Sequence, residues 1–258
     1  MNKVISILGC GWLGFPLSDH LRTLGYQVKG STTTSAHKIA KLQSIGIQAY
    51  SIDLKAAAPR YDDFLDTEVL IITLPATQLA YFDKLLKNIS PSVKIIYTST
   101  TSVYLPSEYP IDENGILDEK SPHLLIEKLL KINQNPTTIL RLAGLFNAER
   151  HPGKWFANKV LSNPNAPVNL IHLDDCIGII EQVIKKNIWE QTFNACTDEH
   201  PSRKDFYTRA TQVIGQQIRE VLDTSTLSKL IDNKLLKNTL DYHFKISLNA
   251  FLQDYEIS

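Results

Sequence analysis

The sequence predicts an α/β fold in which a doubly wound parallel sheet is covered by helices on both faces. Short apolar runs, such as 4–8, 69–74 and 93–98, recur along the first half of the chain. Runs with few polar residues are typical of strands that are buried on both faces. Amphipathic segments lie between these runs, and a glycine-rich turn follows the first of them directly. This is the pattern of a strand–helix–strand unit with a parallel crossover.

The elements can be assigned in order along the chain. We expect strands at 4–8, 26–29, 48–52, 69–74, 93–98 and 138–142, and helices after the first turn and over 36–46 and 79–88. Gly25 ends the first helix in the manner of a left-handed cap. After Gly144 the alternation gives way to a polar, proline-containing stretch. Short strands are predicted at 168–172 and 192–195, and the chain from Ser202 onward is predicted to be largely helical and amphipathic.

Composition narrows the function classes. The 258 residues contain 27 Lys plus Arg and 27 Asp plus Glu, so there is no basic excess of the kind that nucleic-acid binders carry. No apolar run is long enough to span a membrane, and the N-terminus lacks the features of a secretory signal, so we expect a cytoplasmic protein. Cys10, Cys176 and Cys196 fit neither a disulfide framework nor a zinc site, and we expect no metal.

The strongest motif is the turn Gly9-Cys10-Gly11-Trp12-Leu13-Gly14. It follows a strand and opens a helix, which is the context of a dinucleotide fingerprint. Gly9 allows the tight turn, Gly11 lets the backbone approach a pyrophosphate, and Gly14 lets helix and strand pack closely. The pyrophosphate would then meet the helix N-terminus. The alternative is an ordinary glycine-rich turn. The motif favours a Rossmann-type NAD(P)-binding domain over 1–150, followed by a substrate-side region over 151–258 in which 168–196 returns to the core sheet.

The segment after the second strand bears on which dinucleotide binds. An NAD site has an acidic residue about 20 positions after the glycines, but residues 29–34 contain none. The hydroxyls of Ser31, Thr32, Thr33 and Thr34, with Lys38 and His37 nearby, could accept a 2′-phosphate. This favours NADP, with NAD as the alternative if these residues form only a solvated loop.

Further segments resemble the extended and atypical short-chain dehydrogenase/reductase proteins of the nucleotide-sugar epimerase/dehydratase type. They run in family order over nearly the whole chain: Ile52-Asp53-Leu54, Thr73-Leu74-Pro75-Ala76, Tyr97 to Tyr104, Arg141-Leu142-Ala143-Gly144, Ile171 to Asp175 and Asn233 to Tyr242. The resemblance implies adenine contacts at Asp53 and Leu54. It places Leu74, Pro75 and Ala76 beside the nicotinamide ribose. Arg150-His151-Pro152-Gly153 is similar to a stretch of an atypical bacterial subgroup described as NAD(P)-dependent epimerases or oxidoreductases.

The chain departs from that family at the catalytic helix. Family members carry Tyr-x-x-x-Lys there, with a Ser or Thr that polarises the substrate oxygen, the role implied for Thr100. Residues 118–128 contain no such pair. Family register places Glu119 at the tyrosine position and His123 at the lysine position, while Ser121 and Pro122 are typical of an N-cap and a first helical residue.

Three outcomes follow from the missing pair. Another residue substitutes, the candidates being Tyr104, Tyr109, His123 and Lys128; or the chemistry needs no relay; or the protein binds its cofactor without turnover. An imidazole such as that of His123 titrates near neutrality, although a histidine at a helix end can equally be a solvated surface residue.

Arg150, His151, Lys154 and Trp155 gather where family members face their substrate. An arginine there could bind a phosphate or carboxylate, and a tryptophan could stack on a ring; the alternative is a surface loop whose Trp155 packs on the core. His172 with Asp174 and Asp175 is interpreted as helix capping in preference to a metal pair.

The sequence therefore favours an NADP-preferring oxidoreductase or epimerase-like enzyme acting on a small polar substrate, of which a nucleotide sugar is one option. A non-catalytic dinucleotide sensor or scaffold is the main alternative, and a structural protein with a vestigial cleft is a third. The resemblance also implies a homodimer.

Overall fold

The computed structural model of the chain describes residues 3–33, 36–76, 79–224 and 226–256. The strands are β1 (Val4–Leu8), β2 (Gln27–Thr32), β3 (Gln48–Ser51), β4 (Val69–Ile72), β5 (Lys94–Thr100), β6 (Thr137–Leu142), β7 (Gly144–Phe146), β8 (Val160–Ser162), β9 (Leu170–His172), β10 (Thr192–Ala195) and β11 (Glu220–Leu222). The helices are α1 (Gly14–Thr23), α2 (Ala36–Ser44), α3 (Leu79–Leu86), α4 (Pro122–Ile132), α5 (Gly153–Phe156), α6 (Leu173–Lys186), α7 (Arg203–Gln212), α8 (Lys234–Leu240) and α9 (Leu248–Glu256), with a 3₁₀ turn over Thr101–Val103. None of the helices in the described ranges is long and apolar enough to cross a membrane.

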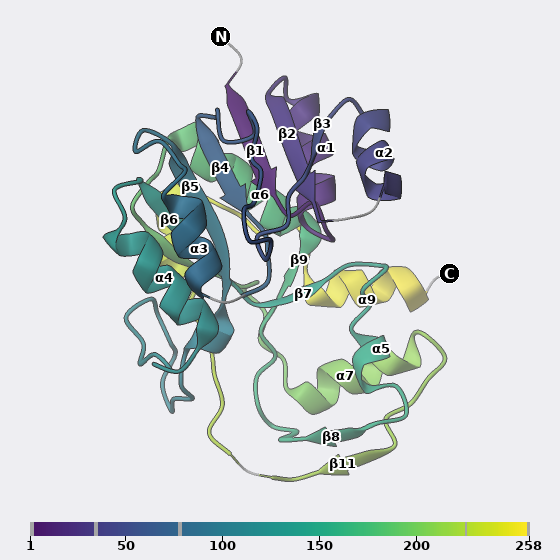
Figure 1. The fold of residues 1–258 in the computed structure, drawn as a ribbon. Coiled ribbons are helices and arrows are strands. Elements are labelled where there is room, and N and C mark those ends of the chain that lie inside the picture. Colours follow the sequence, from purple (N-terminus) through teal and green to yellow (C-terminus); the bar gives the residue numbers. More distant parts are fainter. Residues whose placement is uncertain (1–2, 34–35, 77–78, 225, 257–258) are drawn as a thin grey trace. The chain divides into compact units, whose positions relative to one another are not determined.

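The central sheet has seven strands in the order β10-β6-β5-β4-β1-β2-β3 (Figure 1). β1 pairs in parallel with β2 and β4, and parallel pairing continues from β2 to β3 and from β4 to β5. The predicted doubly wound α/β fold is therefore confirmed. The chain runs outward from β1 to β2 and β3 and then crosses to β4 on the other side of β1, so the sheet has a switch point between β1 and β4, where such folds bind ligands.

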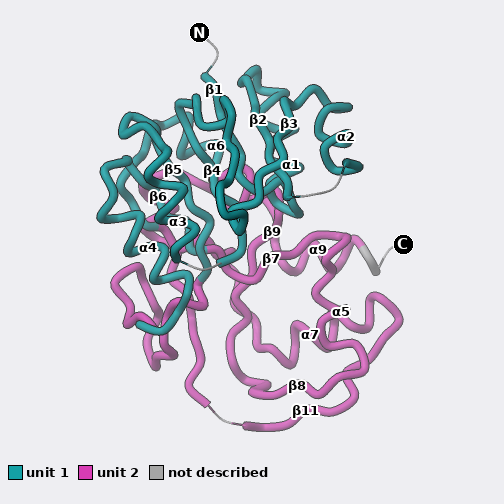
Figure 2. The backbone as a smooth tube through the Cα atoms, viewed as in Figure 1, with its two compact units in different colours: residues 1–100, 119–141, 180–192 teal, residues 101–118, 142–179, 193–258 magenta. Residues whose placement is uncertain are grey.

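The chain divides into two compact units, coloured separately in Figure 2. Unit 1 comprises residues 1–100, 119–141 and 180–192, and unit 2 comprises 101–118, 142–179 and 193–258. Each unit thus collects several chain segments, whereas the sequence suggested continuous parts at 1–150 and 151–258. The boundary between 1–150 and 151–258 therefore remains a prediction about where two separately folding domains would meet.

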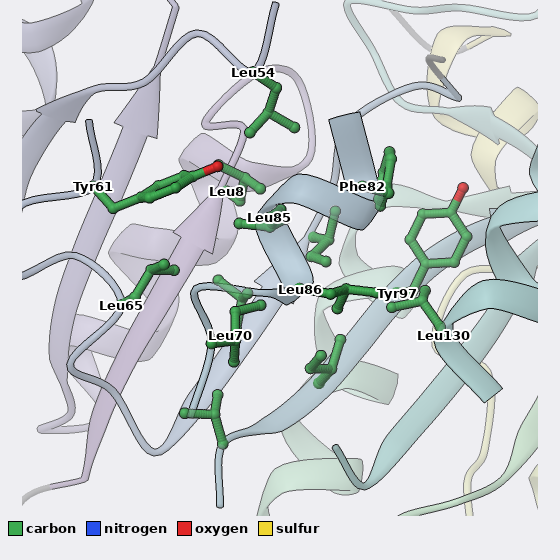
Figure 3. Close-up of a cluster of buried hydrophobic side chains, with 14 of the residues drawn as sticks. Leu8, Leu54, Tyr61, Leu65, Leu70, Phe82, Leu85, Leu86, Tyr97 and Leu130 are labelled. Carbon is green, nitrogen blue, oxygen red and sulfur yellow. The ribbon is translucent and has the colours of Figure 1, made fainter. Parts of the chain in front are cut away.

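Unit 1 buries an apolar cluster between its sheet and α3 and α4 (Figure 3). Fully buried members come from the strands, such as Leu70 and Ile95, and from the helices, such as Phe82 and Leu130. Tyr97 of β5 packs edge-on against Phe82, with ring centroids 5.9 Å apart. This packing holds α3 against β5.

A buried ion pair joins α4 to the sheet. Glu127 and Arg141 are each 1 % exposed. The Arg141 Nη2 donates to Glu127 Oε2 at 2.6 Å, and its Nε lies 3.1 Å from both carboxylate oxygens. Ser99 Oγ donates to Glu127 Oε1 at 2.5 Å. Both charges are therefore paired and hydrogen-bonded, which buried charges require.

Unit 2 contains two small sheets and a second apolar cluster. β7 pairs with β9, and β8 with β11, both in parallel. The sequence assigned 168–172 to the core sheet, but β9 pairs with β7 instead, because the chain leaves the central sheet at Ala143 and its continuation offers a new edge. The second predicted strand, β10, does join the central sheet. Helices α7, α8 and α9 lie in the tail that was predicted to be largely helical, but β11 and irregular stretches separate α7 from α8.

Candidate functional site

The glycine turn between β1 and α1 has the geometry that the motif predicts. Gly9 has φ of +104°, which is left-handed backbone, and a Cβ on it would lie 2.6 Å from Leu74 Cδ2. A Cβ on Gly14 would lie 2.3 Å from the Gly9 carbonyl oxygen, so α1 can begin this close to the strand only without a side chain there. A Cβ on Gly11, by contrast, would meet no atom of the described chain within 4 Å. The middle glycine therefore faces open space.

Neighbouring strand ends hold the turn in place. The Gly9 amide donates to Ser31 Oγ at 3.2 Å, and the Cys10 amide donates to the Ser31 carbonyl at 2.7 Å. Thr73 Oγ1, just after β4, donates to the Gly9 carbonyl at 2.6 Å. Ser31 is buried at 1 % exposure, so a contact with a 2′-phosphate, which stays a prediction for this residue, would require the turn to open.

Two adjoining hollows lie over the carboxyl ends of β1 to β4 in unit 1. The first, about 150 Å³, is lined by the glycine turn, by 31–33 and by the residues after β4; its lining is Leu8, Gly9, Cys10, Gly11, Ser31, Thr32, Thr33, Lys38, Ile52, Thr73, Leu74 and Pro75. The second, about 220 Å³, is lined by Thr33, Ile52, Asp53, Leu54, Lys55, Leu74, Pro75 and Ala76. The shared lining residues make the two hollows one continuous groove across the switch point.

The groove thus brings together most of the cofactor residues that the sequence predicted, from the glycine turn to Ala76. Trp12 and Leu13 belong to the turn itself, and Leu13 is buried ahead of α1. Thr34 lies outside the described residues. The sequence interpretation missed Thr73 as a brace for Gly9, although a polar residue directly after an apolar strand is the signal that could have found it.

Helix α4, which the resemblance placed in register with the family's catalytic helix, begins where the capping signals predicted. Its first residue is Pro122, and the Ser121 side chain accepts from the Leu124 amide at 3.5 Å. Glu119, in the family's tyrosine register, therefore precedes the helix, and its carboxylate pairs with Lys128. No tyrosine lies on α4, whose residues are all described.

His123, in the first turn of α4, is half-buried, and its Nδ1 lies 3.0 Å from the Tyr97 hydroxyl. Burial lowers the pKa of His123, an effect partly opposed by the negative charge of Glu127. Burial, and after it the charge of Glu127, raises the pKa of Tyr97. Thr100 ends β5 and is partly exposed.

The remaining candidates lie in unit 2. Tyr104 is buried, and its hydroxyl donates to Asn194 Oδ1 at 2.7 Å. His151 is also buried: its Nδ1 accepts from the Gly153 amide, and its ring packs on Phe251 at 5.3 Å. A substrate contact at His151 stays a prediction, and it would require this packing to open.

Arg150 is exposed, whereas Trp155 packs at 6.2 Å from the Tyr207 ring. The Asp174 amide donates to His172 Nδ1 at 3.2 Å, and the buried Asp175 carboxylate accepts from Tyr242 and from the Lys245 and Ile246 amides. The first contact caps α6 locally, and the others brace Asp175 against residues 67 to 71 positions further along the chain. Among the described residues, no three His, Cys, Asp or Glu side chains are grouped so that they could hold a metal ion.

Comparison with solved structures defines the class. The fold is that of the short-chain dehydrogenase/reductase proteins. A superfamily member from Agrobacterium tumefaciens with bound NAD matches with a TM-score of 0.80 at 16 % identity, over 98 % of this chain and 96 % of that one. UDP-glucuronic acid 4-epimerase from Bacillus cereus, in complex with UDP-glucuronic acid and NAD, matches with a TM-score of 0.76 at 20 % identity, over 98 % of each chain.

Sequence comparison then gives the family. Protein YeeZ of Escherichia coli K12 is 33 % identical over 270 aligned positions, which cover 94 % of this chain and 96 % of that protein. The chain belongs to the family of Protein YeeZ. No family model matches the chain.

Proposed function

We propose that this protein binds a nicotinamide dinucleotide, with NADP preferred, and acts as an oxidoreductase or epimerase-like enzyme on a small polar substrate. The observation that carries the proposal is the open space at Gly11. It lies between Gly9, whose backbone is left-handed, and Gly14, whose missing side chain lets α1 begin next to the strand. A backbone cradle at a helix N-terminus suits a pyrophosphate, because amide groups and the helix dipole both favour negative charge.

The groove residues have the chemistry that a dinucleotide needs. Asp53 and Leu54 would hold the adenine, and Leu74 to Ala76 would border the nicotinamide ribose. Thr33 and Lys38 line the first hollow and are exposed, so they would meet a 2′-phosphate. The absence of a carboxylate over 29–34 supports NADP, since a carboxylate would repel that phosphate.

When bound, the nicotinamide supplies hydride transfer. Thr100, at the end of β5, would donate a hydrogen bond to the reacting oxygen of a carbinol or carbonyl group. Arg150 and Trp155 are the candidates for binding substrate. A nucleotide sugar is the substrate class we favour, by analogy with the UDP-glucuronic acid that the Bacillus cereus epimerase binds.

A second candidate is a dinucleotide sensor that binds without turnover. The start of α4 at Pro122 favours a sensor that binds without turnover. The helix carries no tyrosine, and its fourth and fifth residues, Leu125 and Ile126, are apolar and cannot transfer a proton. Thr100→Val separates the two functions. If the protein is an enzyme, Thr100→Val should abolish turnover and leave cofactor binding intact. Unchanged turnover would show that Thr100 has no part in the mechanism.

The first test is calorimetric titration of the cofactor-stripped protein with NADP and NAD in both redox forms. We expect binding, with NADP tighter. Gly11→Asp should abolish it, because a carboxylate would face the pyrophosphate in the space that Gly11 leaves open. Unchanged binding by Gly11→Asp would show that the site is misplaced, and no binding of either dinucleotide by the native protein would overturn the proposal.

The preference for NADP has its own test. Lys38→Ala should weaken NADP binding by about tenfold or more, the usual worth of a hydrogen bond to a charged group, and leave NAD binding unchanged. Lys41→Ala is the matched control: it lies on the same helix, but its Nζ sits 4.3 Å over the Phe15 ring. Equal losses for both dinucleotides in Lys38→Ala would refute the 2′-phosphate contact.

A further inference from the structure

Two side chains 26 residues apart meet where β5 packs against α4. The Tyr97 hydroxyl lies 3.0 Å from His123 Nδ1, and the two rings are stacked with their centroids 6.4 Å apart and 29° between their planes. Tyr97 is fully buried and wedged against Phe82. The Tyr97 ring therefore cannot turn without disturbing the packing of unit 1.

The direction of the hydrogen bond follows from burial. The hydroxyl proton of a buried tyrosine needs an acceptor, and within the described part of the chain His123 Nδ1 is the acceptor that Tyr97 contacts. Burial favours neutral forms, so it keeps Tyr97 protonated and His123 uncharged. Tyr97 therefore donates to Nδ1, and the ring proton of His123 must reside on Nε2.

The charge nearest to this pair is itself neutralised. Glu127 lies one turn along α4 from His123, and it acts on both His123 and Tyr97. Its carboxylate is already saturated by Arg141 and Ser99. Glu127 therefore does not compete for the Tyr97 proton, and its charge opposes the effect of burial on the pKa of His123 without exceeding it.

The pair lies at the ligand-binding edge of the sheet. Tyr97 is in register with Ile72 of β4, and two residues beyond Ile72 the chain lines the groove at Leu74. In a parallel sheet both strands end at the same edge, and Leu74, which lines the groove, packs against the apolar cluster that contains Tyr97.

We propose that Tyr97 is a positioning residue that holds His123 as a neutral imidazole, and that His123 uses its Nε2–H as a hydrogen-bond donor to an acceptor oxygen of a ligand bound at this edge. The part of this inference that concerns the ligand rests on the proposed function. The part that concerns the tautomer of His123 does not depend on it. In this role His123 is a hydrogen-bond donor and not a general base. A general base would need an unprotonated Nε2.

The tautomer is tested by long-range ¹H–¹⁵N correlation spectra of the ¹⁵N-labelled full chain, with His123 assigned by His123→Asn. We expect the Nε2–H form in the native protein. Tyr97→Phe should mix the tautomers and raise the His123 midpoint by about 0.5–1 pH unit, because a bond to the neutral ring is lost. Tyr81→Phe is the control, since Tyr81 packs on the same cluster. An Nδ1–H tautomer, or spectra unchanged by Tyr97→Phe, would overturn the proposal.

Ligand titrations identify the acceptor. A shift of the His123 Nε2–H resonance on adding NADP places the acceptor on the dinucleotide. A shift only when UDP-glucuronic acid is added to the NADP-loaded protein places it on the substrate. Binding of NADP by calorimetry with no His123 shift in either titration would overturn the inference and leave the proposed function standing. Absence of binding of both NADP and NAD would overturn the proposed function, while the tautomer result would still decide the role of Tyr97.

Discussion

Replacing Arg141 with leucine should destabilise unit 1 severely, because it leaves the buried Glu127 carboxylate without its cationic partner. Arg141 and Glu127 are each 1 % exposed, and three N–O contacts of 2.6–3.1 Å join them. Removing one partner of such a pair costs about 3–5 kcal/mol, since the other charge stays out of water without compensation. That is a large part of a typical unfolding free energy of about 5–15 kcal/mol.

The assay is urea unfolding, followed by circular dichroism and by tryptophan fluorescence. With a slope of about 3 kcal/mol per molar urea, the midpoint of Arg141→Leu should fall by on the order of 1 M. The double variant Glu127→Met/Arg141→Leu should recover at least about 2 kcal/mol, because it removes the stranded charge and fills the space with apolar atoms. Ser99 loses its acceptor in the double variant, which limits the recovery.

The exposed pair formed by Asp83 of α3 and Lys87, the residue after this helix, provides the control. Lys87→Ala should change the unfolding free energy by less than about 0.5 kcal/mol, since exposed pairs contribute little. A loss below about 1 kcal/mol in Arg141→Leu, or a double variant no more stable than the single one, would refute the reasoning.

Two further predictions concern buried groups. The Tyr61 hydroxyl is buried with no hydrogen-bond partner among the described residues, so Tyr61→Phe should leave the unfolding free energy unchanged or raise it by up to about 1 kcal/mol; a loss above that size in urea unfolding would contradict this. Burial lowers the pKa of His151 and His172 below the ordinary 6.5, so the unfolded chain binds more protons than the folded one below that pH. Their contribution to stability should be complete above about pH 6.5 and decline as the pH falls, and His172→Gln should flatten the slope of melting temperature between pH 7.5 and 5.5; an unchanged slope would count against it.

The sequence predicted those features of the fold that depend on interactions between residues close together in the chain. The apolar run 4–8, the spacing of Gly9, Gly11 and Gly14, and the Ser121-Pro122 cap each act within a few residues. The structure shows the strand, the turn and the helix start at those positions. The groove residues from Asp53 to Ala76 were placed by family resemblance, which carries information on strand order that spacing lacks.

The side-chain pairs that shape the site could not be predicted, because sheet order and helix packing create them. Thr73 reaches Gly9 across 64 positions, and Tyr97 reaches His123 across 26. In the sequence Tyr97 is one more apolar member of a buried strand. Ser31 shows the same limit: the sequence suggests a phosphate contact for its hydroxyl, which stays a prediction, but does not reveal that this hydroxyl accepts a hydrogen bond from the Gly9 amide.

The missing Tyr-x-x-x-Lys has a physical consequence for the proposed chemistry. The inner face of α4 is occupied by Glu127 and its apolar neighbours. Lys128 and Lys131 are both exposed, and Lys128 is paired with Glu119, so neither lysine of this helix is buried beside β5. General acid–base catalysis contributes typically about 10²–10⁴-fold, and one well-placed hydrogen-bond donor about 10²–10³-fold. A chain that keeps Thr100 and a neutral His123 donor but no proton relay should therefore polarise a bound oxygen well and transfer protons slowly. This predicts tight cofactor binding with modest turnover, in which the proton reaches the oxygen from solvent.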